Sequence, residues 1–344
     1  MGEIRSKQNP KSSKHLDLKN KLIQTKVHIP KLIADAHGRT FKTLRVSLTN
    51  VCNFGCTYCV EGDGIQKENS TLKSASLSEI IAQLHHLLGL QTIRLTGGEP
   101  TLYKGLVPLV AELSKLNIPL KMTSNGFLLP KMAKDLANAG LESINISLDA
   151  ISPVTFEAMA RRKGLAQVLD GIDACLQEGI QVKLNSVIMK SLNDQEVLPL
   201  FEYARSKQIS IRYLELMRMG HLFSNRFDEH FFSQNEILKV ISSKYLFSEV
   251  NRKESATANY WQTADGFQFG IIANESEPFC HDCDRLRLDS NGNIFGCLSE
   301  NKSISISELM NDEEMLEKLL HKALLHKQAL RFTGSQLTMI GIGG

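Results

Sequence analysis

The 344-residue sequence lacks the features that mark membrane, secreted and nucleic-acid-binding proteins. No stretch approaches the roughly 20 apolar residues that a membrane-spanning helix needs. The first residues contain no apolar segment typical of a secretory signal, so we expect a cytoplasmic protein. The net charge of +3 is too small to indicate a nucleic-acid partner, and the length favours two domains or one large α/β domain with an appendage.

Cysteine is sparse, yet six of the seven cysteines are grouped into two triplets. The triplets are Cys52, Cys56 and Cys59 near the start, and Cys280, Cys283 and Cys297 near the end. Because no secretory signal is present, the thiols are expected to be reduced, which favours metal binding or catalysis over disulfides. The seventh cysteine, Cys175, lies in an expected helix and is interpreted as a buried apolar residue.

The first triplet forms the short run Cys52-x-x-x-Cys56-x-x-Cys59. Three thiolates on a tight loop can hold three corners of a four-iron cluster and leave one iron open to a small molecule. Zinc sites also use three cysteines, but no further His or Cys stands beside this loop, so we favour iron–sulfur. The spacing, with an aromatic residue directly before the last cysteine, resembles the signature of the radical S-adenosylmethionine (SAM) enzymes.

The second triplet is open to two interpretations, because Cys-x-x-Cys also begins zinc ribbons and His281 could be a fourth ligand. The segment after Cys283 reads Asp-Arg-Leu-Arg-Leu, and this alternation places Arg285 and Arg287 on one face of an expected strand. Two guanidinium groups beside a metal site are suited to a phosphate, although a pair of surface arginines would look the same. Because of this pair of arginines, we favour an iron–sulfur cluster over zinc at the second triplet.

The chain is organised as an arm, a core and a second region. Residues 1–40 are rich in Lys and Ser and are interpreted as a flexible basic arm. In the core, 41–234, six strand and helix patterns alternate, which predicts a parallel sheet with helices outside it. Expected strands are 44–48, 92–96, 120–123, 143–148, 182–188 and 209–216, and expected helices are 77–88, 106–116, 130–138, 168–178 and 196–207. The second region, 235–344, is expected to hold short strands at 245–272, helices at 304–310 and 313–325, and a Gly-rich tail.

Residues suited to chemistry follow the ends of successive expected strands, where ligands bind in parallel α/β folds. They are the first cysteine loop, Gly97-Gly98-Glu99-Pro100, Asn125-Gly126 and Asp149. The two glycines let the backbone approach a ligand closely. Cations within the apolar strands are explained by a polyanion in a cavity, although each could be half of a salt bridge. They are Arg45, Arg94, Lys183 and Arg212.

Together these motifs resemble the radical SAM family of GTP 3′,8-cyclases, which act in molybdenum cofactor biosynthesis. The likeness begins at about residue 41 and includes both cysteine triplets, 96–100, Ser147-Leu148-Asp149-Ala150, 283–288 and Gly343-Gly344. It implies an α/β fold, an incomplete (βα)6 TIM-type barrel closed by a C-terminal iron–sulfur module. It also implies that SAM is cleaved to a radical and that GTP is converted into 3′,8-cyclo-7,8-dihydro-GTP.

The resemblance also implies roles for individual residues. The six cysteines of the triplets would hold two 4Fe-4S clusters. The residues implied for SAM are Tyr58, Gly98, Glu99, Ser147 and Met217, and those for GTP are Arg45, Arg94, Thr123, Lys183, Arg212, Arg285 and Arg287. Gly343 and Gly344 would reach into the site and assist hydrogen abstraction. Implied partners are a reducing protein such as flavodoxin or ferredoxin, the downstream cyclic pyranopterin monophosphate synthase and a second copy of the chain.

Three departures from the family pattern concern phosphate contact and loop stability but no cluster ligand. Asn50-Val51 stands where Asp-Arg is usual, Gly55 replaces a common Arg, and Thr92 stands where Lys is frequent. Three alternatives follow from the sequence. They are another radical SAM enzyme with an auxiliary cluster, a divergent paralogue that has lost GTP cyclisation, and a zinc-binding scaffold.

Overall fold

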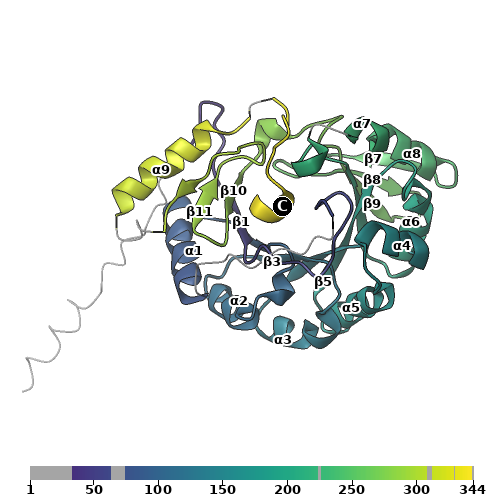
Figure 1. The fold of residues 1–344 in the computed structure, drawn as a ribbon, viewed down its shortest axis with the longest axis horizontal. Helices are drawn as coiled ribbons and strands as arrows, with labels where there is room; N and C mark the ends of the chain where they lie inside the picture. The colour runs from purple at the N-terminus through teal and green to yellow at the C-terminus, as the bar shows by residue number, and fades with distance from the viewer. Residues whose placement is uncertain (1–32, 63–73, 224–225, 308–311, 329, 343–344) are drawn as a thin grey trace, which may run out of the picture. The chain divides into compact units, whose positions relative to one another are not determined.

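A computed structural model describes residues 33–62, 74–223, 226–307, 312–328 and 330–342. Among them, one sheet contains twelve strands (Figure 1). The strands are β1 (Thr43–Ser47), β2 (Thr92–Thr96), β3 (Leu120–Ser124), β4 (Ser143–Ser147), β5 (Gln181–Ile188), β6 (Ser210–Glu215), β7 (Phe247–Val250), β8 (Asn259–Thr263), β9 (Gln268–Ile272), β10 (Arg285–Leu288), β11 (Asn293–Phe295) and β12 (Ile304–Ser305). Their order is β12-β11-β10-β1-β2-β3-β4-β5-β6-β9-β8-β7, so β7 and β12 are the two edges.

Figure 1 shows helices α1 to α6 outside the curved sheet. The helices are α1 (Ser74–Leu88), α2 (Leu106–Ser114), α3 (Ala133–Asn138), α4 (Pro153–Ala160), α5 (Leu165–Gln177), α6 (Val197–Ser206), α7 (Phe227–His230), α8 (Gln234–Ser242), α9 (Glu313–Leu325) and α10 (Met339–Ile342). Strands β1 to β6 pair in parallel, each with the next, and helices connect them. This arrangement confirms the predicted incomplete barrel.

Alternation along the strands separates the core from the interior of the barrel. In β1, Leu44 and Val46 are completely buried, and in β2 so are Ile93 and Leu95. Successive side chains of a strand point to opposite faces, so the polar residues between these apolar ones face inwards, and Arg45 lines a cavity there. The period-two pattern therefore builds an apolar layer under the helices and a polar inner wall.

The C-terminal region extends this sheet at both sides. Strand β9 pairs in parallel with β6 and carries the antiparallel strands β8 and β7. Strand β10 pairs in parallel with β1 and carries β11 and β12. The second cysteine triplet is therefore placed beside the first strand of the barrel, although about 230 residues separate them in the sequence. The region boundary at residue 234 stays a prediction.

Two expected helices differ in the structure. The helix expected at 304–310 was wrong at its start, because Ile304–Ser305 is strand β12 and pairs with β11. Its buried–exposed–buried pattern through Ile306 has period two, which fits a strand better than a helix, and residues 308–311 lie outside the described part. The helix expected at 130–138 is divided at Met132 into a 3₁₀ turn, Leu129–Lys131, and α3.

The N-terminal arm was expected to extend to residue 40, but two side chains within 33–40, those of Ile33 and Arg39, are buried. Ile33 is 2% exposed, and Arg39 donates hydrogen bonds to the carbonyl oxygens of Cys280 and Gln328. These contacts fix the segment against the C-terminal region, and residues 1–32 lie outside the described part. In the described residues, no helix combines the length and apolar character needed to cross a membrane.

Candidate active site

A cavity of about 1020 Å³ is lined by residues of strands β1 to β10. It brings together every predicted metal, cofactor and substrate residue within the described part of the chain. These residues are Cys52, Cys56, Cys59, Cys280, Cys283, Cys297, Tyr58, Gly98, Glu99, Ser147, Met217, Arg45, Arg94, Thr123, Lys183, Arg212, Arg285 and Arg287. The predicted Gly343 and Gly344 lie outside the described residues, but Met339 and Ile340 of α10 line the same cavity.

The first cysteine loop follows β1 and is anchored from both sides. The ring of Phe54 packs edge-on against Phe127 at 5.8 Å and Phe156 at 5.9 Å between centroids. The Cys59 amide donates to the Cys56 carbonyl at 2.9 Å, which closes a tight turn between the two thiols. A buried aromatic anchor with a tight turn holds the loop in one conformation. Burial raises the pKa of Cys59 to about 12, so binding a metal there requires the metal to displace a proton.

The segment Gly97-Gly98-Glu99-Pro100 joins the end of β2 to the cysteine loop. The Gly98 amide donates to the Thr49 carbonyl at 2.7 Å, and the Glu99 amide donates to the Val51 carbonyl at 2.8 Å. A Cβ atom on Gly98 would lie 2.6 Å from the carbonyl carbon of Val51, so only glycine fits. The two backbones are therefore in direct contact at the cavity wall.

Glu99 is buried, and its carboxylate is hydrogen-bonded to neighbouring groups of the protein. It accepts hydrogen bonds from the Thr101 amide and hydroxyl at 3.0 and 2.6 Å, the Ser124 hydroxyl at 2.8 Å and the Asn125 amide at 2.6 Å. Three of these bonds end at Oε1 and one ends at Oε2, so both oxygens are bound to the protein itself. The carboxylate thus fixes the ends of β2 and β3 together, and its role in binding SAM stays a prediction.

Tyr58 and Asp149 form a buried pair next to the first triplet. The Tyr58 hydroxyl donates to Asp149 at 2.9 Å, and the Val187 amide donates to the other carboxylate oxygen at 2.8 Å. Burial raises the pKa of Asp149 to about 6, although both hydrogen bonds oppose this shift. The pair fixes the aromatic residue that precedes Cys59 against the end of β4.

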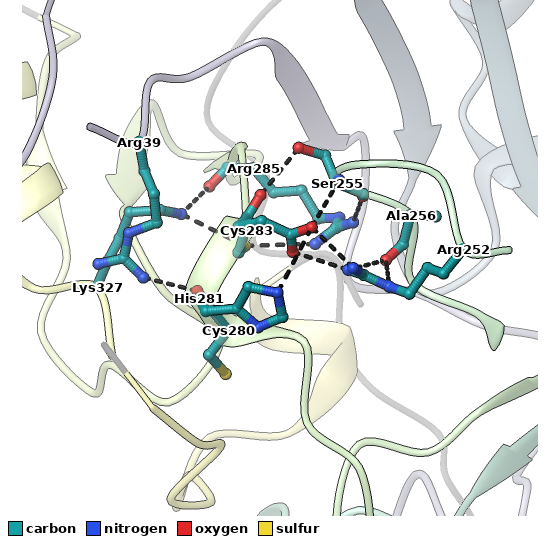
Figure 2. A network of polar contacts seen from close by, with 10 residues as sticks. Arg39, Arg252, Ser255, Ala256, Cys280, His281, Cys283, Arg285 and Lys327 are labelled. Atoms are coloured by element: carbon teal, nitrogen blue, oxygen red, sulfur yellow. Dashed lines mark hydrogen bonds and ion pairs between the residues drawn. The ribbon is translucent and has the colours of Figure 1, made fainter. Parts of the chain in front are cut away.

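Two cysteines of the second triplet, Cys280 and Cys283, lie among the cations Arg39, Arg285 and Lys327 (Figure 2). Arg285 and Lys327 donate to the sulfur of Cys283 at 3.3 and 3.5 Å. Burial would raise the pKa of Cys283, but the charges of Lys327 and Arg285 outweigh it and lower the pKa to about 7. By contrast, burial raises the pKa of Cys280 to about 11. Cys283 is therefore more readily deprotonated than Cys280, and the thiolate is the form that binds a metal.

In the part of the chain that the structure describes, no three Cys, His, Asp or Glu side chains gather closely enough to hold one metal ion. A four-iron cluster has a different requirement, because each thiolate binds a different iron and the sulfurs stand around the cluster. All three thiols of each triplet line the cavity, and those within a triplet affect one another's charge. The donor sets therefore fit two clusters.

Cations form a row across four neighbouring strands of the inner wall. Arg45 of β1 is opposite Arg287 of β10 on one side and Arg94 of β2 on the other. Arg94 is in turn opposite Lys121 of β3. Like charges directly opposite each other destabilise a sheet, and an anion in the cavity would relieve this repulsion.

Within the described part of the chain, three members of this row make no close ion pair, although Glu142 attracts Lys121 electrostatically. Among the described residues, Arg45, Arg94 and Lys121 make no ion pair. Burial, and after it the charges of Arg212 and Arg285, lower the pKa of Arg94 to about 9. The protein thus concentrates positive charge where it is poorly solvated, and a polyanionic ligand would relieve the cost.

Several buried polar atoms at the cavity have no hydrogen-bond partner among the residues that the structure describes. They are Arg45 Nε, Thr123 Oγ1, Ser210 Oγ, Asn274 Nδ2 and Asp284 Oδ1. Buried polar atoms without a partner are rare in folded proteins, and a cluster of them needs an explanation. A polar ligand in the cavity supplies one.

Sequence reasoning missed Lys121, Arg39 and Lys327. Lys121 could have been found, because it is two residues before Thr123 and therefore shares its face of β3. Arg39 and Lys327 lie outside the strand pattern, and no local signal connects them to the second triplet. Their contacts depend on segments far apart in the chain.

Comparisons with known proteins agree with this site. Residues 46–204 match the radical SAM superfamily, and residues 209–332 match the family described as Molybdenum Cofactor Synthesis C. The chain is 37% identical over 303 residues to the GTP 3′,8-cyclase of Helicobacter pylori, covering 86% of this chain and 93% of that protein. It is 34% identical over 325 residues to the GTP 3′,8-cyclase of Synechocystis, covering 94% and 98%.

Solved structures with a similar fold have little sequence identity to this chain. Streptococcus suis SuiB bound to S-adenosylmethionine aligns with a TM-score of 0.63 at 13% identity, covering 83% of this chain and 68% of that one. The protein anSMEcpe with bound AdoMet and a peptide aligns with a TM-score of 0.58 at 14% identity, covering 83% and 82%. These two establish the fold, and the curated relatives establish the family. The chain belongs to the radical SAM superfamily and, within it, to the family of GTP 3′,8-cyclases.

Proposed function

We propose that this chain converts GTP into 3′,8-cyclo-7,8-dihydro-GTP in the first step of molybdenum cofactor biosynthesis. The observation that carries the proposal is the row Arg287–Arg45–Arg94–Lys121, which faces a cavity that both cysteine triplets also line. A triphosphate has the charge to neutralise such a row. The cavity volume of about 1020 Å³ lies at the upper end of the range for small-molecule sites, which suits two ligands bound together.

The first triplet is proposed to hold a 4Fe-4S cluster and the neighbouring residues to hold SAM. When bound and reduced by one electron, this pair would cleave SAM to methionine and a 5′-deoxyadenosyl radical, which is the species able to take the C3′ hydrogen of GTP. The chain's own residues position the cofactor: Gly98 brings the backbone to the cavity wall, and Tyr58 is fixed by Asp149. Ser147 and Met217 line the same cavity and are proposed to contact SAM as well. Because a carbon radical reacts with most groups, excluding water and fixing distances are the main tasks of the protein.

The basic wall is proposed to hold the triphosphate. Its members are Arg45, Arg94, Lys121, Lys183, Arg212, Arg285 and Arg287, with Thr123 as a neutral donor. Guanidinium groups fixed on strands can form paired hydrogen bonds to phosphate without first ordering a loop. Lys121 is added to the set implied by the resemblance, because it lines the cavity opposite Arg94. With the phosphate fixed at one end, the ribose and guanine are directed to the space between the two triplets.

The second triplet is proposed to hold a 4Fe-4S cluster that binds the guanine. The tail residues Gly343 and Gly344 are proposed to assist the first hydrogen abstraction, and the support for this is that Met339 and Ile340, shortly before them in the sequence, line the cavity. The remaining partners belong to the proposal as well. They are flavodoxin or ferredoxin as reductant, cyclic pyranopterin monophosphate synthase as the next enzyme, and a second copy of the chain.

The experiment that tests the proposal measures 5′-deoxyadenosine formed by the anaerobically reconstituted, reduced protein with SAM, in the presence of GTP or ATP. Strong stimulation by GTP but not by ATP, with the cyclised nucleotide as product, is the expected result. Cleavage of SAM that is indifferent to GTP would assign the chain to another radical SAM reaction. Absence of cleavage in protein that holds both clusters would indicate a divergent paralogue.

A further inference from the structure

Lys327 is buried beside the second triplet. It follows the C-terminal end of α9 and is 8% exposed. Its ammonium group donates three contacts: to the sulfur of Cys283 at 3.5 Å, to the Arg285 carbonyl at 3.1 Å and to the Gly296 carbonyl at 3.1 Å. Figure 2 shows Lys327 directed towards Cys283. An ammonium group has three N–H donors, so these three acceptors use all of them.

The charge of Lys327 has no carboxylate partner among the described residues. The ring of Phe41 lies 5.1 Å from its nitrogen and supports a cation, but it carries no charge. A buried ammonium group is costly unless an anion balances it. Of its three acceptors, only the sulfur of Cys283 can carry a full negative charge, and it does so when it binds iron as a thiolate.

The two carbonyl contacts connect the segments that carry the cysteines. Arg285 comes two residues after Cys283, and Gly296 comes directly before Cys297. Lys327 therefore joins the two ends of the β10–β11 hairpin, because Arg285 begins β10 and Gly296 directly follows β11. Arg39 adds the third connection, since it donates to the Cys280 carbonyl at 2.7 Å and to the Gln328 carbonyl at 2.6 Å. All three cysteine segments are thus joined to Lys327 and Gln328, which follow α9, either directly by Lys327 or through Arg39.

We propose that Lys327 is a positioning residue for the second cluster, holding the Cys283 thiolate in its ligating orientation and raising the reduction potential of the cluster. The inference rests on the second cluster of the proposed function. Hydrogen bonds to ligand sulfurs and nearby positive charge favour the reduced, more negative cluster, which raises its potential. Because Lys327 is buried, solvent screens this effect less than it screens a surface lysine.

The test compares Lys327→Met with the parent protein in a full-length chain whose Cys52, Cys56 and Cys59 are replaced by Ala, so that only the second cluster is observed. Methionine keeps an apolar stem of similar length but removes the charge and the donors. The midpoint potential is measured by redox titration followed by electron paramagnetic resonance, and iron is counted per chain. Lys322→Met is the matched control, because Lys322 is on α9, exposed, and carries the same charge.

We expect Lys327→Met to retain iron and to shift the midpoint potential to a more negative value, while Lys322→Met leaves it unchanged. A full complement of iron with an unchanged potential in Lys327→Met overturns the proposal, as does an equal shift in Lys322→Met. If Lys327→Met loses the cluster, Lys327→Arg decides: recovered iron supports the role of the charge, and continued loss overturns it. A parent chain without a second cluster would instead reject the proposed function, which separates the two failures.

Discussion

Arg94 and Lys121 are opposite each other on the adjacent parallel strands β2 and β3, and both line the cavity. Arg94 donates a hydrogen bond of 3.3 Å to the Met122 carbonyl, and repulsion from the neighbouring cations Arg212 and Arg285 accompanies its burial. Such a pair reduces the stability of the empty protein and increases its affinity for an anion. Stability and binding should therefore respond to the same substitution in opposite directions.

Replacing Arg94 with Gln should weaken GTP binding by about tenfold or more, because a hydrogen bond from a charged donor is worth about 1.5 kcal/mol or more. The same variant should raise the melting temperature of the protein without GTP, since a poorly solvated charge is removed.

Lys121→Met should weaken GTP binding less, because this lysine is only partly buried. Isothermal titration and thermal denaturation check both effects. Arg205→Gln is the control, because Arg205 is exposed and paired with Asp265, and a matching loss of affinity there would contradict the basic-wall assignment.

Replacing Cys297 with Ser should remove the second cluster and leave the first. Iron per chain is then expected to fall to about half, because each triplet holds one four-iron cluster in the proposed function. SAM binding should persist, since the residues assigned to SAM lie at or after the ends of β1, β2, β4 and β6 and not on the hairpin near Cys297. Iron analysis with equilibrium binding of labelled SAM checks this result. Simultaneous loss of SAM binding would show that the two sites are not separable.

Replacing Gly98 with Ala should disrupt the first site. The new methyl group would lie 2.6 Å from the carbonyl carbon of Val51, so the cysteine loop and the β2 turn must separate. Neither partner is a flexible side chain, and we expect SAM binding and the first cluster to be lost together. Gly179→Ala is the matched control, because it has a positive φ of 75° but open space around its Cβ position. It should cost only about 1 kcal/mol of stability and leave SAM binding intact. Equal effects of both substitutions would contradict a role for the close contact.

Asp149 should make stability depend on pH. Its pKa in the folded protein is raised by burial to about 6, above the usual value of 3.8, so the folded protein retains this proton between about pH 4 and 6 while the unfolded chain has lost it. Stability from this group is therefore present at low pH and lost as the pH rises through 6. Asp149→Asn has no charge to bury. Its free energy of unfolding, measured relative to that of wild type, should therefore increase by about 2 kcal/mol between pH 4 and pH 7.

Denaturant unfolding of both proteins at pH 4.5 and pH 7 measures this difference. Other groups that titrate in the same range are common to both proteins and cancel in the comparison. A constant difference between Asp149→Asn and wild type across this range would show that Asp149 titrates normally. In that case the Tyr58 and Val187 hydrogen bonds would have to outweigh its burial.

Much of the site was predictable from local patterns. The spacing of Cys52, Cys56 and Cys59 specifies a tight loop, and this needs no knowledge of distant residues. The alternation in Leu44-Arg45-Val46 predicts both a strand and the inward direction of its arginine, because side chains alternate along every strand. The same reasoning failed at 304–310, where a short Ile-Ser-Ile alternation was interpreted as part of a helix.

The tertiary structure decided which of these local features meet. Nothing in the sequence near Arg287 says that β10 pairs with β1, and this pairing is what places Arg287 opposite Arg45 and completes the row of cations. The contacts with the second triplet likewise join distant segments, since Arg39 is 241 residues from Cys280 and Lys327 is 44 residues from Cys283. The sequence by itself determined the donor groups and the direction in which each strand presents them, because these depend on neighbouring residues. Register between distant strands depends on how the whole sheet and its helices pack, and only the folded chain determines it.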